Sequence, residues 1–407
     1  MHDPIQDKST MHVAVLWSIA ITAALLIYVV GQWYKEDRGY QPNINQLLSY
    51  EESFSDLLLK LKQTHQYSPT GITYIPVGIW IQSFAFSGSN QVDVSGYLWE
   101  HHVQPELPMV ATGSGVEGDE ALENCAANIP NHKKGNFVLV EAVNDGANVL
   151  SDLMYCDRSG AEVVLGWYFE ATLRQPFNYR KFPIDHKTVW LRLWPRDFSS
   201  NIYPVPALFD FRSTRPGITF GRDSDLVLEN WVLQETFFDY KLKQYDTSFG
   251  FKSFRPGTTH PELHFNIVLK RKFLNAFVLH LVPLVTVAFL LFAVLLTLTK
   301  NEAARDVAGF SLGGVIGMIS GLFFVVLLAH IQLRERFAAS GIVYIEYYYL
   351  LMYVLMLLVT LNAFMISLNS QSPFLQLLIY RDNAPAKLLY WPFSLAVIAV
   401  TTSIILG

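Results

Sequence analysis

Four long apolar stretches in the last third of the chain limit what it can fold into. They cover residues 273–299, 307–333, 341–368 and 388–407. The titratable side chains that interrupt them most clearly are Glu346, His280 and His330. Because a helix rises about 1.5 Å per residue, each stretch is long enough to cross a hydrocarbon core of about 30 Å. The sequence therefore predicts a membrane domain of four helices over residues 273–407.

The second stretch is rich in glycine, with Gly313, Gly314, Gly317 and Gly321 close together. A helix that faces only lipid gains nothing from residues without side chains, whereas small residues let helices pack closely. Small residues can also leave space along a passage that the helix lines. Both interpretations stay open at this point.

Charged residues are concentrated in the middle of the chain. The 407 residues include 30 Lys and Arg and 35 Asp and Glu, but residues 1–33 hold three of these charges and residues 273–407 hold eleven. The middle segment is therefore soluble in character and long enough for one large domain. The net charge of −5 and the lack of a basic stripe argue against nucleic acid as a partner.

A further apolar run, residues 11–33, lies near the N-terminus and carries no charge. It is longer than the apolar region of a signal peptide, and no small-x-small cleavage site follows it. We therefore expect a retained transmembrane anchor over residues 1–33, with a cleaved signal peptide as the alternative. Residues 34–72 are expected to form a helical linker or cap, because their leucines recur at helical spacing.

Residues 73–272 have the pattern of a β-sandwich domain. Strands are expected at residues 77–86 and 92–100, joined as a hairpin by turn residues 87–90. Further strands are expected at residues 137–143, 163–174, 188–193, 224–233 and 263–270, with a loop or insertion at residues 103–135. Many short strands separated by turn signals favour a sandwich.

The chain has two cysteines, Cys125 and Cys156. In an oxidising compartment they can pair, but sequence does not show that their Cα atoms approach within bonding distance. Two buried free thiols are the equal alternative.

No motif points to catalysis. The sequence lacks a Gly-x-Ser-x-Gly elbow, a phosphate-binding loop, a dinucleotide fingerprint and a Cys-x-x-Cys pair. His260 and His264 have a metal-like spacing, but they lie in a strand pattern with no third ligand in view. We therefore expect no enzyme activity, no metal and no cofactor.

One connection between two expected strands is more informative. It contains Phe182-Pro-Ile-Asp185, in which Pro183 fixes φ and Asp185 can bond its own backbone. Alone this is an ordinary β-turn. The chain also has the hairpin ending at Glu100, Trp231 in a late strand, residues 261–272 running into the first span, and Pro283 within that span.

In this order, these features resemble the pentameric ligand-gated ion channels, the Cys-loop receptor superfamily, and particularly its bacterial branch. The resemblance covers about residues 73–407. It implies a homo-oligomer, expected to be a pentamer in a bacterial inner membrane, with residues 73–272 as a periplasmic ligand-binding β-sandwich. The second bundle helix of each copy would line a pore for inorganic ions. Membrane lipid and an unknown small-molecule ligand are the other expected partners.

The chain departs from the family pattern in places. The two loop cysteines of the family would fall near Gln175 and Val189, although bacterial members commonly lack them. The N-terminal span, the 34–72 helix and the stretch that holds Cys125 and Cys156 are additions.

The resemblance also implies a coupling site at the boundary between the domains. Asp185, beside Pro183, is expected near Arg271, where a shielded ion pair could transmit movement. The link that carries Arg334 and Arg336 would receive that movement. The alternative is a static salt bridge that contributes little.

The pore-lining face is left open between two stripes of the second helix. One runs through Asp306, Gly309, Gly313, Gly317, Ser320 and Phe324, and the other through Ser311, Gly314, Met318, Leu322 and Val325. Copies of Glu302, Arg305 or Asp306 would form charged selectivity rings, with a weak preference for cations, and Phe324 or Leu322 a hydrophobic gate.

Aromatic residues are plentiful in the late loops, namely Tyr203, Phe209, Phe211, Phe237, Phe238, Tyr240 and Tyr245. Most are expected to pack in the core or an interface, and no ligand is named. The alternative class is a non-conducting membrane receptor or scaffold of the same architecture.

Overall fold

The computed structural model describes residues 4–39, 73–103, 119–143, 150, 152–197, 202–215, 217–250, 259–299, 311–337, 341–367 and 380–407. The chain divides into two compact units. The first combines Met1–Tyr40, Asn178–Asp185 and Arg271–Gly407, and the second combines Gln41–Phe177 and His186–Lys270. Most of the expected 34–72 helix lies outside the described residues, although helix α1 reaches Arg38.

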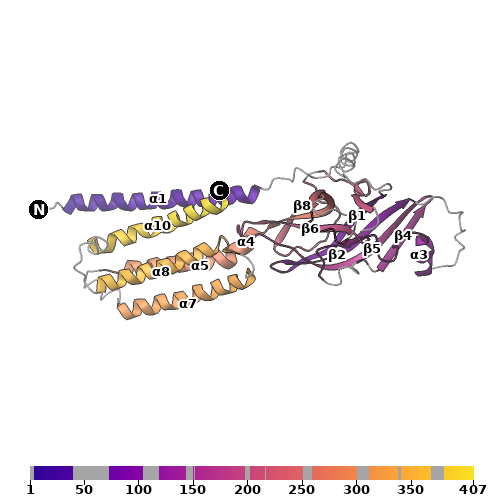
Figure 1. Cartoon of the computed structure of the whole chain (residues 1–407). Coiled ribbons are helices and arrows are strands. Elements are labelled where there is room, and N and C mark those ends of the chain that lie inside the picture. Colours follow the sequence, from indigo (N-terminus) through magenta and orange to yellow (C-terminus); the bar gives the residue numbers. More distant parts are fainter. Residues whose placement is uncertain are drawn as a thin grey trace. The chain divides into compact units, whose positions relative to one another are not determined.

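The first unit is helical (Figure 1). Its elements are α1 (Pro4–Arg38), α4 (Phe273–Ala276), the π-helix η2 (Phe277–Leu281), α5 (Val282–Thr297), α7 (Leu312–Arg336), α8 (Glu346–Ser367) and α10 (Tyr380–Leu406). Among the described residues, five helices are long and apolar enough to cross a membrane, which indicates an integral membrane protein. The spans expected at residues 11–33, 273–299, 307–333, 341–368 and 388–407 each overlap one of them.

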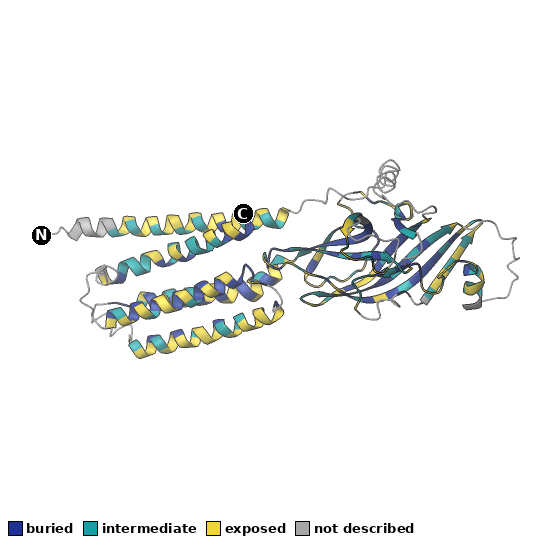
Figure 2. Cartoon of the chain, viewed as in Figure 1, coloured by how far each residue is buried: buried dark blue, intermediate teal, exposed yellow. Residues whose placement is uncertain are grey.

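Helix α1 packs on α10, and the other four form a bundle in which α8 contacts α5, α7 and α10, and α5 also contacts α7 and α10. Large parts of α1 and α7 are exposed (Figure 2), among them the apolar residues Leu16, Ile27, Met318 and Phe324. Exposed apolar faces of this extent fit a surrounding of lipid or of other copies of the chain.

The first bundle span changes its winding near Pro283. The π-helix η2 precedes α5, in which Pro283 occupies the first turn. Proline lacks the N–H that would bond the carbonyl four residues earlier, so a change of winding here has a local cause.

The second unit contains two sheets. Their strands are β1 (Thr73–Gly88), β2 (Gln91–Val103), β3 (Phe137–Leu139), β4 (Asp152–Ser159), β5 (Glu162–Arg174), β6 (His186–Pro195), β7 (Ile202–Pro206), β8 (Trp231–Gln244) and β9 (Thr259–Arg271). One sheet has the order β4-β5-β2-β1-β7 and the other β3-β6-β9-β8. The expected hairpin is present: β1 pairs antiparallel with β2, and Gly88 lies opposite Gln91.

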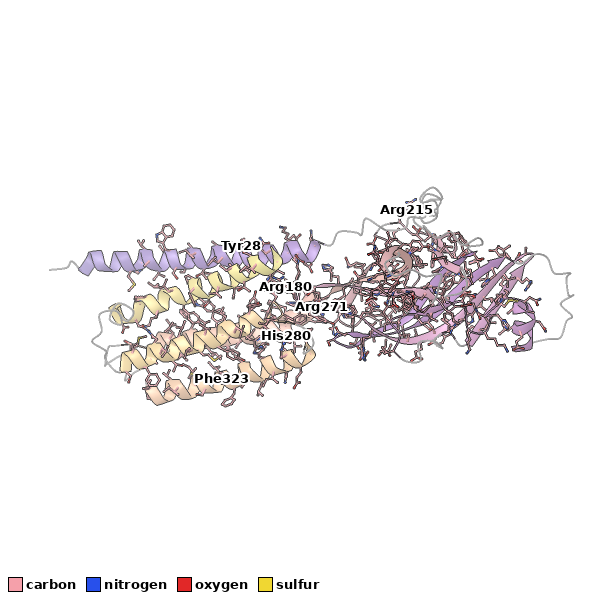
Figure 3. All side chains as sticks on the ribbon, in the orientation of Figure 1. Tyr28, Arg180, Arg215, Arg271, His280 and Phe323 are labelled. Atoms are coloured by element: carbon pink, nitrogen blue, oxygen red, sulfur yellow. A yellow bond between two sulfur atoms is a disulfide. The ribbon has the colours of Figure 1, made fainter. Side chains whose placement is uncertain are left out.

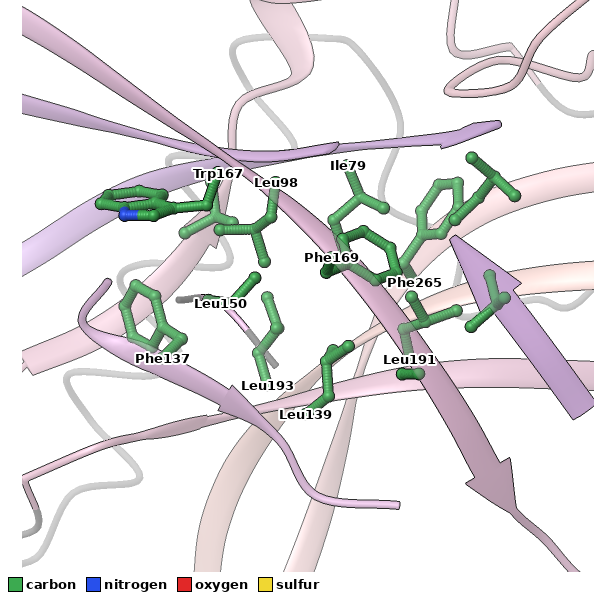
Figure 4. Close-up of a cluster of buried hydrophobic side chains, with 14 of the residues drawn as sticks. Ile79, Leu98, Phe137, Leu139, Leu150, Trp167, Phe169, Leu191, Leu193 and Phe265 are labelled. Atoms are coloured by element: carbon green, nitrogen blue, oxygen red, sulfur yellow. The ribbon is translucent and has the colours of Figure 1, made fainter. Parts of the chain in front are cut away.

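A single cluster of buried hydrophobic side chains joins the two sheets (Figure 4). Leu98 and Trp167 enter it from the five-stranded sheet, and Leu191 and Phe265 from the four-stranded sheet. Burial alternates along β6, and three of its four buried residues, Val189, Leu191 and Leu193, are apolar, whereas the fourth is Lys187. The arrangement is compatible with the expected sandwich.

One expectation for this unit is wrong. The strand expected at residues 224–233 begins only at Trp231, because the Asp223 carboxylate instead accepts a 2.9 Å bond from the Asp225 amide and forms a turn. The stretch expected as a loop or insertion at residues 103–135 contains the helix α3 (Asp119–Ala126), and residues 104–118 lie outside the described residues.

Cys125 and Cys156 form a disulfide, with their Cα atoms 6.1 Å apart. The bond attaches α3 to β4, and the Arg158 guanidinium adds a 2.6 Å bond to the Cys125 carbonyl. Of the two alternatives left open by the sequence, the paired form is therefore the one observed.

Candidate functional site

The segment 178–185 is a compact turn between β5 and β6 that belongs to the helical unit. The Phe182 amide donates to the Tyr179 carbonyl at 2.9 Å, and the Ile184 amide donates to the Lys181 carbonyl at 2.8 Å. Asn178 begins the turn by accepting a 2.9 Å bond from the Arg180 amide. The peptide between Phe182 and Pro183 is cis. We call residues 178–185 the coupling loop.

Asp185 and Arg271 form a two-point ion pair at the end of the coupling loop. Arg271 Nε lies 2.6 Å from Asp185 Oδ1 and Nη2 lies 3.2 Å from Oδ2. The Asp185 side chain is 3% exposed and that of Arg271 is 13% exposed. A paired, shielded contact of this kind is stronger and more directional than a surface salt bridge.

An aromatic layer lies beside the ion pair. The Arg271 guanidinium carbon is 4.8 Å from the centre of the Phe182 ring. The Phe182 ring lies 4.6 Å from the ring of Phe337 and 5.7 Å from that of His280. Tyr179 also packs on Phe337, and burial raises the pKa of Tyr179 to about 12. Arg271 and His280 are labelled in Figure 3.

The coupling loop contacts both ends of the connection between α7 and α8. Phe337, which immediately follows α7, packs on Phe182 and Tyr179. Tyr344, just before α8, donates its amide to the Arg180 carbonyl at 2.9 Å. A displacement of the coupling loop would therefore also displace the C-terminal end of the glycine-rich helix α7.

Arg334 and Arg336 are the basic residues that were expected to receive movement from the coupling loop. Arg334 donates to the buried Glu346 at 3.3 Å and to the Gly341 carbonyl at 3.2 Å. Arg336 is exposed at the end of α7. Within the expected receiving link, Arg334-Glu-Arg-Phe337, the ring contacts with the coupling loop are made by Phe337.

Gly313, Gly317 and Gly321 of α7 do not pack against another helix in the part of the chain that the structure describes. A side-chain carbon added at Gly313, Gly317 or Gly321 would meet nothing within 4 Å. Ser320 and Phe324 are exposed as well, whereas Val315 and Ile319 form the buried stripe. Close packing within one chain therefore does not explain Gly313 and Gly317. Glu302, Arg305 and Asp306 lie outside the described residues.

A second polar cluster surrounds Glu262 on β9. Its carboxylate accepts bonds from Trp194 Nε1 at 2.6 Å, from Arg192 at 3.2 Å and from the Tyr245 hydroxyl. Burial alone would raise the pKa of Glu262, but His264 and these donors lower it to about 2. The Glu262 side chain is 4% exposed and the Arg192 guanidinium already balances its charge, so the cluster joins β6, Tyr245 and β9.

The other aromatic residues named from the sequence serve mainly in packing. Phe237 and Phe238 are buried, Phe211 packs on Phe220, and the Tyr240 hydroxyl bonds the Pro204 carbonyl at 2.7 Å. Tyr245 alone of that set meets a buried carboxylate. The Glu262 cluster was missed because its members lie far apart in the sequence and carry no common motif.

Comparison with family models gave no match, and comparison with curated proteins gave none either. The functional argument therefore depends on the residues and geometry described above.

Proposed function

We propose that the chain is the subunit of a pentameric ligand-gated ion channel. The observation that carries the proposal is the seating of the Phe-Pro-Ile-Asp turn: Asp185 pairs with Arg271, and Phe182 packs on Phe337 at the end of the glycine-rich helix. In such a channel, a strand-to-strand turn that contacts the membrane helices passes ligand-induced movement to the pore.

In this proposal, the two sheets act as a β-sandwich sensor and α5, α7, α8 and α10 as the channel bundle. The disulfide between Cys125 and Cys156 supports a periplasmic or other oxidising location for the sensor. The sensor would bind a small-molecule ligand.

The helix α7 is assigned to the pore. Its exposed small residues Gly313, Gly317 and Ser320 leave room beside the helix that no other described helix of the chain fills. In a ring of five copies, such a face would line a hydrated passage, and Phe324 would form an apolar constriction that closes by dewetting. Inorganic ions are the transported species.

The test is conduction by the full-length protein in planar lipid bilayers. We expect single-channel currents for the wild type. Gly317→Trp should lose most of the conductance, because an indole would fill the passage. The matched control is Leu290→Trp, at an exposed position of α5, which should conduct like the wild type.

Equal currents from Gly317→Trp and the wild type would show that α7 does not line the pore. Silence of the correctly assembled wild type under all ligand and pH conditions would favour the non-conducting receptor that the same architecture allows.

A further inference from the structure

The helix α1 docks on the bundle along one continuous stripe. The less exposed positions of its described part follow helical spacing, at Met11, Ala14, Ser18, Thr22, Leu25, Val29, Trp33 and Glu36. The remaining positions are mostly exposed and apolar. The stripe faces α10, the helix with which α1 packs.

Two hydrogen bonds hold α1 to α10 within the apolar region. Ser18 Oγ donates to the Leu388 carbonyl at 2.6 Å. That carbonyl is four residues before Pro392, which has no N–H to bond it within the helix. An unsatisfied carbonyl group is unfavourable in lipid, and the Ser18 hydroxyl supplies the hydrogen bond that the Leu388 carbonyl would otherwise lack. The Tyr28 and Ser403 hydroxyls add a second bond at 2.7 Å.

At its C-terminal end, α1 reaches the coupling loop and its partners. Lys181 Nζ lies 2.7 Å from Glu36 Oε1. Trp33 Nε1 donates to the Tyr344 hydroxyl at 2.8 Å, and the Trp33 ring lies 5.6 Å from that of Phe273. Tyr344 in turn bonds Thr402 of α10 at 2.7 Å. One turn of α1 therefore contacts the loop, the segment before α8 and the start of the first bundle span.

We propose that α1 is a control helix of the channel, in which Trp33 and Glu36 position the coupling loop and thereby set the gating equilibrium. The proposal rests on the proposed function. A simple membrane tether requires only a long apolar helix. It does not require the indole of Trp33 to donate to Tyr344, or the carboxylate of Glu36 to pair with Lys181 of the coupling loop. Displacing α1 would remove the Glu36 partner of Lys181 and the Trp33 donor to Tyr344 together, which loosens the loop, while the Tyr344 hydroxyl would keep its bonds to Tyr348 and Thr402.

The first measurement does not depend on conduction. Amide hydrogen exchange is followed at Phe182, Ile184 and Tyr344 in the full-length protein in lipid nanodiscs. The double variant Trp33→Phe/Glu36→Gln keeps an aromatic ring, removes the indole donor and removes the charge that pairs with Lys181. We expect exchange to quicken by about fivefold, because one hydrogen bond is lost and the ion pair is weakened. Unchanged exchange at these three amides overturns the proposal.

Matched variants separate positioning from general loss of structure. Trp17→Phe alters a tryptophan of the same helix far from the loop and should leave the three rates within about twofold of wild type. The charge swap Glu36→Lys/Lys181→Glu should restore most of the protection that Glu36→Gln loses. Failure of the swap together with an effect of Trp17→Phe would show that any disturbance of α1 loosens the loop, and would overturn specific positioning.

The second measurement is the open probability in planar bilayers at fixed voltage. A several-fold change in Trp33→Phe/Glu36→Gln, absent in Trp17→Phe, supports control of gating. Faster exchange with an unaltered open probability overturns it. Faster exchange in a protein whose wild type never conducts supports the positioning of the loop by α1 and overturns the channel function instead.

Discussion

Both polar atoms of the Gln175 side-chain amide form hydrogen bonds with the backbone of Trp190. Its Nε2 donates to the Trp190 carbonyl, and its Oε1 accepts from the Trp190 amide at 3.3 Å. Gln175 is 1% exposed, so these bonds are sheltered from water. They close the segment between β5 and β6 near the two positions where the family resemblance would place a disulfide.

Replacing Gln175 by Leu should therefore destabilise the sheets. The substitution keeps side-chain bulk but leaves the Trp190 amide and carbonyl without this partner, at an expected cost of about 2 kcal/mol. Chemical denaturation followed by tryptophan fluorescence measures the loss. Gln91→Leu, on the more exposed hairpin, is the control and should change stability by less than about 0.5 kcal/mol.

The Asp185–Arg271 pair should behave as a directional link. Asp185→Arg places two cations in a shielded site, so we expect a stability loss of about 3 kcal/mol and the loss of ligand- or pH-dependent currents. Exchanging the two residues, Asp185→Arg/Arg271→Asp, should restore part of both properties. Wild-type gating in an assembled Asp185→Arg protein would reduce the pair to a static contact.

A histidine on β2 should make stability depend on pH. His101 Nδ1 lies 3.0 Å from Glu162 Oε1, and Nε2 lies 2.8 Å from Asp210 Oδ2. Burial lowers the pKa of His101, but the two carboxylates outweigh burial, and the net change is upward. The stabilisation is therefore fully present below the ordinary value of about 6.5 and is lost as the pH rises through the raised value.

Unfolding of wild type and of His101→Gln over this pH range measures the effect. The difference in stability between the two proteins should shrink as the pH rises above about 6.5. A difference that is constant, or that grows with pH, would contradict the role of the imidazolium.

The disulfide should stabilise the second unit. It closes a segment with a sequence separation of 31 residues, for which the loss of chain entropy in the unfolded state corresponds to roughly 3.7 kcal/mol. Cys125→Ser/Cys156→Ser should lower the denaturation midpoint accordingly, and reduction of the wild type should reproduce the shift. If the reductant changes the double variant as well, the shift has another origin.

Elements with a strong local pattern could be predicted from the sequence. The five apolar spans, the β1–β2 hairpin and the turn that holds Asp185 all follow from periodicity or turn chemistry. β7 was missed because Pro204 and Pro206 argue against a strand, yet β7 lies at a sheet edge, where proline is tolerated. β4 is also an edge strand, and its charged residues hide the alternation.

The site was predictable in part for a similar reason. The Asp185–Arg271 proximity followed from the resemblance, since both residues have positions in its pattern. The contacts of Lys181 with Glu36 and of Trp33 with Tyr344 join segments separated by 145 and 311 positions. No local signal marks such pairs, and they depend on which helices become neighbours.

The central claim is that copies of the chain assemble around an axis lined by α7. Electron cryo-microscopy of the full-length protein, solubilised without chemical cross-linking, tests it most directly. The account predicts a closed ring of five subunits with Gly313, Gly317 and Ser320 facing the axis. A lone protomer, or a ring whose α7 helices lie at its periphery, would contradict it.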